Sequence, residues 1–255
     1  TLFVATALSI SLYLIGFAES MLPVIQDIFG IQEITINHFR IVGSIALMVV
    51  LFVAYVSTSF AIKIQYVILV LIGLSLISIF TGSSDGLKKG TDLVTNPNFA
   101  VLFGIFFPAV TGFTAGVAMS GDLKSPSKSI PWGTMLAIVT GLIVYLALAF
   151  FLNASIDKEI LTTNNNVLIE FGSIAFLVVA GVWGATLSSA LGGILGGPRI
   201  LQAMSLDNIA PKIFAVGHGV NNEPRNALIL TFIISELGIL IGELNVIAEI
   251  VAMFY

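Results

Sequence analysis

Uncharged apolar segments long enough to cross a lipid bilayer recur along this chain and decide what it can fold into. The segment from Phe99 to Gly121 carries no charged residue, and the chain starts with another apolar segment, TLFVATALSISLYLIGFA. Because an α-helix rises about 1.5 Å per residue, roughly 20 apolar residues span the hydrocarbon core. A soluble fold of 255 residues cannot hide several such segments. We therefore expect an integral, multi-pass membrane protein.

The composition agrees with a membrane protein and argues against other classes. Charged residues make up 9% of the chain and hydrophobic residues 57%, whereas a soluble domain carries roughly 25% charged residues. The absence of cysteine excludes disulfides and thiolate chemistry. The only histidines, His38 and His218, are expected in loops and cannot assemble a metal site or a catalytic triad. We expect no enzyme, no cofactor, no metal beyond transported cations and no nucleic acid partner.

Eight membrane segments are predicted, separated by polar connectors that contain turn residues. Continuous apolar runs, in place of alternating ten-residue segments, favour helices over a transmembrane barrel. We expect an all-α membrane protein in which residues 1–255 form one transmembrane domain. The predicted spans cover about 2–23, 39–60, 64–82, 99–120, 132–153, 172–197, 226–242 and 245–255.

The distribution of lysine and arginine predicts the orientation in the membrane, because cytoplasmic loops carry an excess of these residues. With a cytoplasmic N-terminus, four basic residues lie outside: Arg40, Lys88, Lys89 and Lys158. The other six lie inside: Lys63, Lys124, Lys128, Arg199, Lys212 and Arg225. The excess favours a cytoplasmic N-terminus.

The stretch FFPAVTGFTAGVAMSGDL, from Phe106 to Leu123, is interrupted midway along its span. Pro108 removes an amide donor, and Gly112 and Gly116 permit non-helical geometry. Open backbone persists at membrane depth only where protein or a water-filled cavity satisfies it. Amides freed on one half-helix suit an anion, and carbonyls freed on the other suit a cation. We predict an ion site here; the alternative is a proline kink with small residues for helix packing.

Other polar groups at membrane depth allow two interpretations each. Ser188 and Ser189 could supply hard oxygens to a small cation or simply pack at a helix interface. The hydroxyl of Tyr13 needs a partner, which is either an ion or another helix. Glu19 and Glu236 are ionisable groups inside spans, and we consider substrate or proton coupling as well as interhelical hydrogen bonding.

These motifs resemble a known family. The stretch FFPAVTGFTAGVAMSGDLKSPSKSIPWGT resembles the sixth transmembrane helix and following loop of the cation-chloride cotransporters, within the amino acid-polyamine-organocation superfamily. YLIGFAES resembles their third helix, ATLSSAL their eighth and IGELNVIAEIVAMF the start of their tenth. The resemblance implies a five-plus-five inverted-repeat transporter core with discontinuous helices. This chain would hold helices three to ten, without the first two helices or any C-terminal soluble domain.

By position, the resemblance also implies three ion sites of the sodium-potassium-chloride type. The potassium and sodium sites would use side chains and carbonyls, whereas the chloride site would use the backbone of a turn at the start of a half-helix. The implied residues are Tyr13, Pro108 and Thr111 for potassium, Gly112, Phe113 and Thr114 for chloride, and Ala185, Ser188 and Ser189 for sodium.

The implied function is electroneutral symport of Na⁺, K⁺ and Cl⁻ by alternating access in the plasma membrane. The expected partners are these ions and the lipid bilayer, with a homodimer as the assembly to test. Two alternatives stay open, namely an amino acid permease of the same fold and a non-transporting scaffold or regulatory subunit. Phe113 and Thr114 replace aliphatic residues usual in the family, and Glu236 and Glu249 stand where it usually has apolar residues or proline. The ion stoichiometry is therefore not implied.

Overall fold

The chain folds into a bundle of helices. The computed structural model describes residues 1–30, 33–56, 58–82, 98–110, 112, 115–118, 120, 123–164, 166–219 and 222–255. These residues form α-helices and 3-10 turns, with one isolated antiparallel bridge between His218 and Glu223. Among them, five helices are long and apolar enough to cross a membrane. The prediction of an all-α membrane protein is confirmed.

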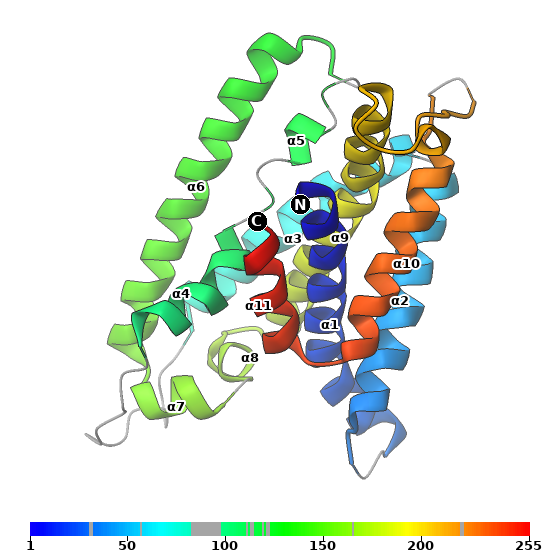
Figure 1. Ribbon diagram of the computed structural model, residues 1–255. Coiled ribbons are helices and arrows are strands. Elements are labelled where there is room, and N and C mark those ends of the chain that lie inside the picture. The colour runs from blue at the N-terminus through cyan, green and yellow to red at the C-terminus, as the bar shows by residue number, and fades with distance from the viewer. Residues whose placement is uncertain are drawn as a thin grey trace.

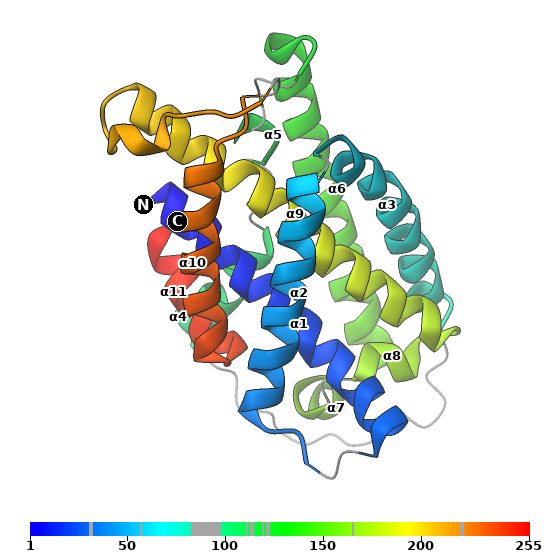
Figure 2. The same cartoon turned by 90° about the vertical axis from the view of Figure 1, so that its right-hand side faces the viewer.

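The long helices are α1 (Leu2–Phe29), α2 (Ile36–Val56), α3 (Thr58–Phe80), α6 (Pro126–Ser155), α9 (Ala175–Leu206), α10 (Arg225–Ile241) and α11 (Leu244–Phe254). The short elements are α4 (Phe99–Phe106), η1 (Phe107–Val110), α5 (Ala115–Ala118), α7 (Lys158–Thr163), α8 (Val167–Phe171) and η3 (Lys212–Phe214). In Figures 1 and 2, α1, α2 and α3 run in alternating directions through the bundle, and so do α6, α9, α10 and α11. The long helices α3 and α6 run in the same direction, because the segment that contains α4 and α5 returns the chain to the upper end between them.

The predicted spans match these helices, with two corrections. The predicted span that ends near residue 197 continues as α9 to Leu206, because Leu201 and Ser205 stay buried and prolong its packing face beyond Pro198. The polar connector predicted after residue 153 contains the helices α7 and α8. In α8, Val167 and Phe171 are buried, one helical turn apart, and this apolar pair anchors the connector to the bundle.

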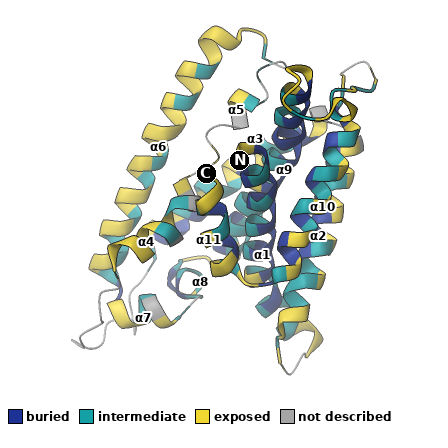
Figure 3. Cartoon of the chain, in the orientation of Figure 1, coloured by how far each residue is buried: buried dark blue, intermediate teal, exposed yellow. Residues whose placement is uncertain are grey.

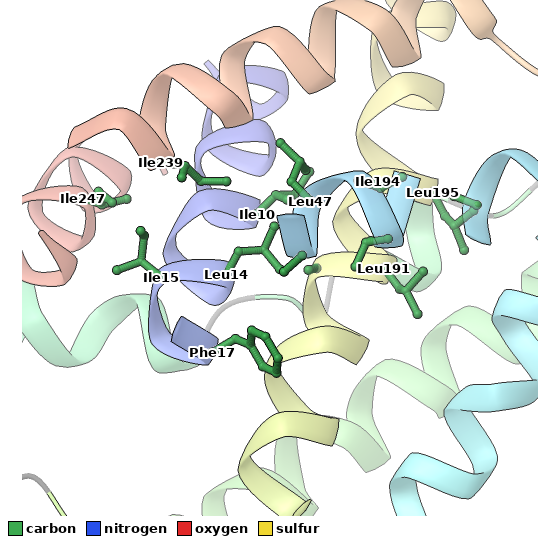
Figure 4. Packing of buried hydrophobic residues seen from close by; sticks show 14 of the residues in the cluster. Ile10, Leu14, Ile15, Phe17, Leu47, Leu191, Ile194, Leu195, Ile239 and Ile247 are labelled. Atoms are coloured by element: carbon green, nitrogen blue, oxygen red, sulfur yellow. The ribbon is translucent and has the colours of Figure 1, made fainter. Parts of the chain in front are cut away.

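The main hydrophobic core surrounds α1. Figure 3 shows the buried residues concentrated on α1 and α9, and Figure 4 shows how their side chains meet in the interior. Ile10 and Leu14 of α1 are completely buried, and they belong to one apolar cluster with Leu47 of α2, Leu191 of α9 and Ile239 of α10. Helices far apart in the sequence thus pack against the same central helix.

A reciprocal pair of hydrogen bonds joins α1 to α10 inside this core. Ser11 Oγ donates to the carbonyl of Ser235 at 2.7 Å, and Ser235 Oγ donates to the carbonyl of Ala7 at 2.9 Å. A Cβ at Gly238 would lie only 2.7 Å from Ser11 Cβ, so this position requires glycine for the close approach. Such hydrogen bonds between membrane helices each contribute roughly 0.6 kcal/mol. They add to the apolar packing that holds α1 against α10.

In contrast, α6 lies at the edge of the bundle and has no buried residue. Aromatic pairs connect α6 to the rest of the bundle. The ring centroids of Phe106 and Tyr145 are 5.5 Å apart, and those of Phe80 and Phe151 are 5.1 Å apart. An apolar helix that is exposed along its length is typical of a surface that faces lipid.

We expect Gly181→Ala to destabilise the packing of α3 against α9. A Cβ at Gly181 would overlap the side chain of Ser75, so one of the two helices must shift. Overpacking of this kind costs about 1–3 kcal/mol, which a thermal unfolding midpoint in detergent will detect. The matched control on the same helix is Gly192→Ala, because nothing lies within 4 Å of that Cβ. Equal stability of the two variants would contradict the close contact.

Candidate functional site

The predicted break in the fourth membrane segment is present. The helix α4 ends at Phe106, the turn η1 contains Pro108, and α5 begins only at Ala115. Gly112 lies between these pieces with φ of 95°, a conformation that favours glycine because it has no Cβ. The predicted site residues Thr111, Phe113 and Thr114 lie outside the described residues. The predicted non-helical backbone is confirmed at Gly112.

A cavity of about 310 Å³ adjoins the break and brings several predicted site residues together. Its walls come from α1, α3, α5, α9 and the C-terminal end of the chain. The lining residues are Thr6, Ser9, Tyr13, Gln65, Gly112, Ala118, Ser188, Ser189, Gly192, Gly193, Gly196, Ile200 and Tyr255. Residues predicted for the potassium, chloride and sodium sites thus line one cavity although they are up to 176 residues apart, the separation between Tyr13 and Ser189.

Tyr13 reaches the break from the central helix α1. A Cβ built at Gly112 would lie 3.8 Å from the hydroxyl oxygen of Tyr13, which places the phenol beside the open backbone. The geometry therefore joins one predicted potassium residue to one predicted chloride residue. Pro108, the other described residue predicted for potassium, lies in η1 on the preceding side of the break.

The two neighbouring serines of α9 differ in their hydrogen bonds. Ser189 Oγ donates to the carbonyl of Ala185 at 2.8 Å, which is the bond that a packing serine makes one turn back. This bond turns the hydroxyl hydrogen away and leaves the oxygen lone pairs free for a cation. Ser188 also lines the cavity, and within the described part of the chain its hydroxyl makes no hydrogen bond. The pair can present two hydroxyl oxygens to one ligand.

Four polar residues that line the cavity were not predicted from the sequence. Thr6 and Ser9 precede Tyr13 by seven and four residues, which places all three on one face of α1. This spacing could have identified them. Gln65 of α3 and Tyr255 at the end of α11 carry no comparable signal, because only the fold brings them to the cavity.

The cavity has a neutral lining that contains several polar groups. Among the described residues that form its walls, none is Asp, Glu, Lys or Arg. Hydroxyl, amide and backbone oxygens can replace part of the hydration shell of a small cation without a fixed negative charge. Backbone amides at the start of a half-helix favour an anion. The described oxygens therefore suit a small cation, whereas the amides of Phe113 and Thr114, which are predicted for chloride, lie outside the described residues.

The two intramembrane glutamates have different environments. Glu19 is exposed on α1 and does not line the cavity. Glu236 of α10 accepts a hydrogen bond from Ser44 Oγ of α2 at 2.6 Å. Of the two interpretations considered for Glu236, the interhelical hydrogen bond is the one that this geometry supports.

We expect Glu236→Gln to preserve the contact between α2 and α10, because the amide oxygen still accepts from Ser44. Glu236→Ala removes the acceptor and should lower the free energy of unfolding by about 1 kcal/mol. Thermal unfolding of both variants in detergent measures the difference. A loss of stability in the glutamine variant as large as in the alanine variant would show that the charge, not the hydrogen bond, is what stabilises this interface.

Comparisons with known proteins show which families this chain is similar to. The family model described as amino acid permease matches residues 1–255. Solute carrier family 12 member 2 of Mus musculus is 32% identical over 98% of this chain and 26% of its own length. Solute carrier family 12 member 1 of Homo sapiens is 31% identical over 98% of this chain and 28% of its own length. The chain thus spans about a quarter of the length of these curated relatives.

Proposed function

Because this chain belongs to the amino acid permease family, we propose that it forms the ion-binding core of an electroneutral symporter of Na⁺, K⁺ and Cl⁻. The similarity to members of solute carrier family 12 over 98% of the chain supports the choice of a cotransporter within this family. The motifs that resemble the cation-chloride cotransporters support the choice of ions.

One observation carries the proposal, namely the cavity that Tyr13, Gly112, Ser188 and Ser189 line together. Two hydroxyl oxygens on α9 would hold sodium, and the phenol of Tyr13 would contribute to the potassium site beside the break. The open backbone at Gly112 would contribute to the chloride site. We assign Pro108, Thr111, Phe113, Thr114 and Ala185 to these sites by the family resemblance alone.

The transport mechanism that fits this site is alternating access, in which the cavity opens to one side of the membrane at a time. Neutral oxygens bind cations weakly enough to release them. Neighbouring ions of opposite sign stabilise each other, and this attraction is stronger in a site of low dielectric. Binding of chloride next to two cations would therefore strengthen all three sites, and electroneutral transport of two cations would require a second chloride in each cycle. We place the protein in the plasma membrane, with the N-terminal end of this chain on the cytoplasmic side.

Uptake of rubidium, a potassium substitute, by the full-length protein in proteoliposomes tests the function. We expect removal of external sodium or of external chloride to reduce uptake at least tenfold. Uptake that ignores both ions would overturn the proposal. Displacement of a bound amino acid without any effect of chloride would instead identify an amino acid permease, and absence of all transport would favour a scaffold.

A further inference from the structure

A second cavity lies on the outer face of the bundle, between α2 and α10. It is an apolar groove of about 470 Å³, and Figure 2 shows the two helices that form it side by side. Several of its side chains are largely exposed, including Phe52 at 67% and Ile229 at 60%. The groove is lined by Met48, Leu51, Phe52, Leu228, Ile229 and Phe232, with Tyr55 and Arg225 at one end.

The end of this groove opens into a small pocket that contains charged side chains. The pocket holds about 40 Å³ and shares Tyr55, Arg225 and Leu228 with the groove. Its other lining residues are the charged Arg199 of α9 and Glu223 and the apolar Ala54, Ile194, Leu195, Pro198 and Pro224. The apolar groove thus ends at charged groups, an arrangement that fits an amphipathic ligand.

The charged side chains of this pocket are those of Arg199, Glu223 and Arg225. The guanidinium carbon of Arg225 lies 5.1 Å from the centre of the Tyr55 ring. This stacking orients the group and leaves its N–H donors at the edge of the plane. Within the described part of the chain, the Arg225 side chain makes no hydrogen bond or ion pair. An anion can therefore complete this pocket.

We propose that this site binds a membrane phospholipid with an anionic headgroup. The acyl chain would lie in the α2–α10 groove, and the phosphate would accept hydrogen bonds from Arg225. A free anion would leave the apolar groove without a function, and Arg225 lies at the helix end, the depth at which headgroups sit. Basic pockets between transmembrane helices are known to hold anionic lipid headgroups. The site does not overlap the ion cavity, so the inference does not depend on the proposed transport.

Native mass spectrometry of the full-length protein, released from nanodiscs of mixed phosphatidylglycerol and phosphatidylcholine, tests the headgroup. We expect phosphatidylglycerol to be retained in excess over phosphatidylcholine. Arg225→Gln should reduce this excess about fivefold, whereas Arg225→Lys should keep most of it. The matched control is Lys63→Gln, which removes one positive charge at the same end of the bundle and should change the excess less than twofold.

The groove is tested separately with bulky substitutions on α10. Ile229→Trp fills the groove and should reduce lipid retention, while Leu237→Trp, at an equally exposed position outside the groove, should not. Equal retention of the two lipids, or equal effects of the Arg225→Gln and Lys63→Gln variants, would overturn the proposal. Normal retention in Ile229→Trp would also overturn it, because the headgroup would then bind without its acyl chain.

Discussion

Replacing Ser188 with alanine in the full-length protein is expected to raise the external sodium concentration that rubidium uptake requires. Ser188 lines the cavity, and its hydroxyl makes no hydrogen bond to the described residues, so its oxygen is available to a cation. Hydrogen bonds to charged groups contribute about 1.5–3 kcal/mol, and we take the same magnitude for a hydroxyl oxygen that contacts a cation. The apparent sodium affinity should therefore fall by at least tenfold. Uptake measured over a range of external sodium concentrations gives this value.

A matched control lies on the same helix. Thr186 Oγ1 donates to the carbonyl of Val182 at 2.9 Å and does not line the cavity. Thr186→Val removes a hydroxyl from α9 without touching the proposed site and should leave the required sodium concentration unchanged. If both variants raise this concentration equally, the effect comes from α9 as a whole, and the assignment of sodium to Ser188 is wrong.

Replacing Tyr13 with phenylalanine is expected to weaken rubidium uptake while sodium dependence persists. The substitution removes only the hydroxyl, which lies beside the open backbone at Gly112. With the same contribution of about 1.5–3 kcal/mol that we use for Ser188, the rubidium concentration for half-maximal uptake should rise about tenfold or more. Because the ring remains, α1 should keep its packing in the core.

The control for this variant is Tyr66→Phe on α3. Tyr66 is 71% exposed and does not line the central cavity, so its hydroxyl should not affect uptake. Thermal unfolding of both variants separates a change in binding from a change in folding. Unchanged rubidium affinity in a stable Tyr13→Phe protein would remove Tyr13 from the potassium site.

Hydropathy and spacing were sufficient to predict the membrane spans and the break. Pro108 and Gly112 interrupt an uncharged run, and the structure ends α4 and turns the chain at these positions. The family predicted from the motifs is confirmed by the matching family model and relatives. These features are local in the sequence, because they follow from backbone chemistry over one or two helical turns.

The neighbours of each helix could not be predicted in the same way. Ser44 and Glu236 are 192 residues apart, and nothing in their flanking sequences indicates that they meet. Gln65 of α3 lines the same cavity as residues of α9, and α3 approaches α9 closely at Gly181, where a Cβ would overlap Ser75. Apolar helices in a membrane lack a strong hydrophobic force to select partners. Their arrangement depends on shape, which a hydropathy pattern does not record.

The packing of α1 against α9 has a consequence for the energetics of binding. Tyr13 and Ser188 lie on these two long helices, which share one buried core, so the distance between them is nearly fixed. Side chains on two mutually packed helices need little ordering when a ligand arrives, so a cation that binds between α1 and α9 would meet a preorganised surface. Calorimetry of sodium binding to the full-length protein should then show only a small unfavourable conformational entropy.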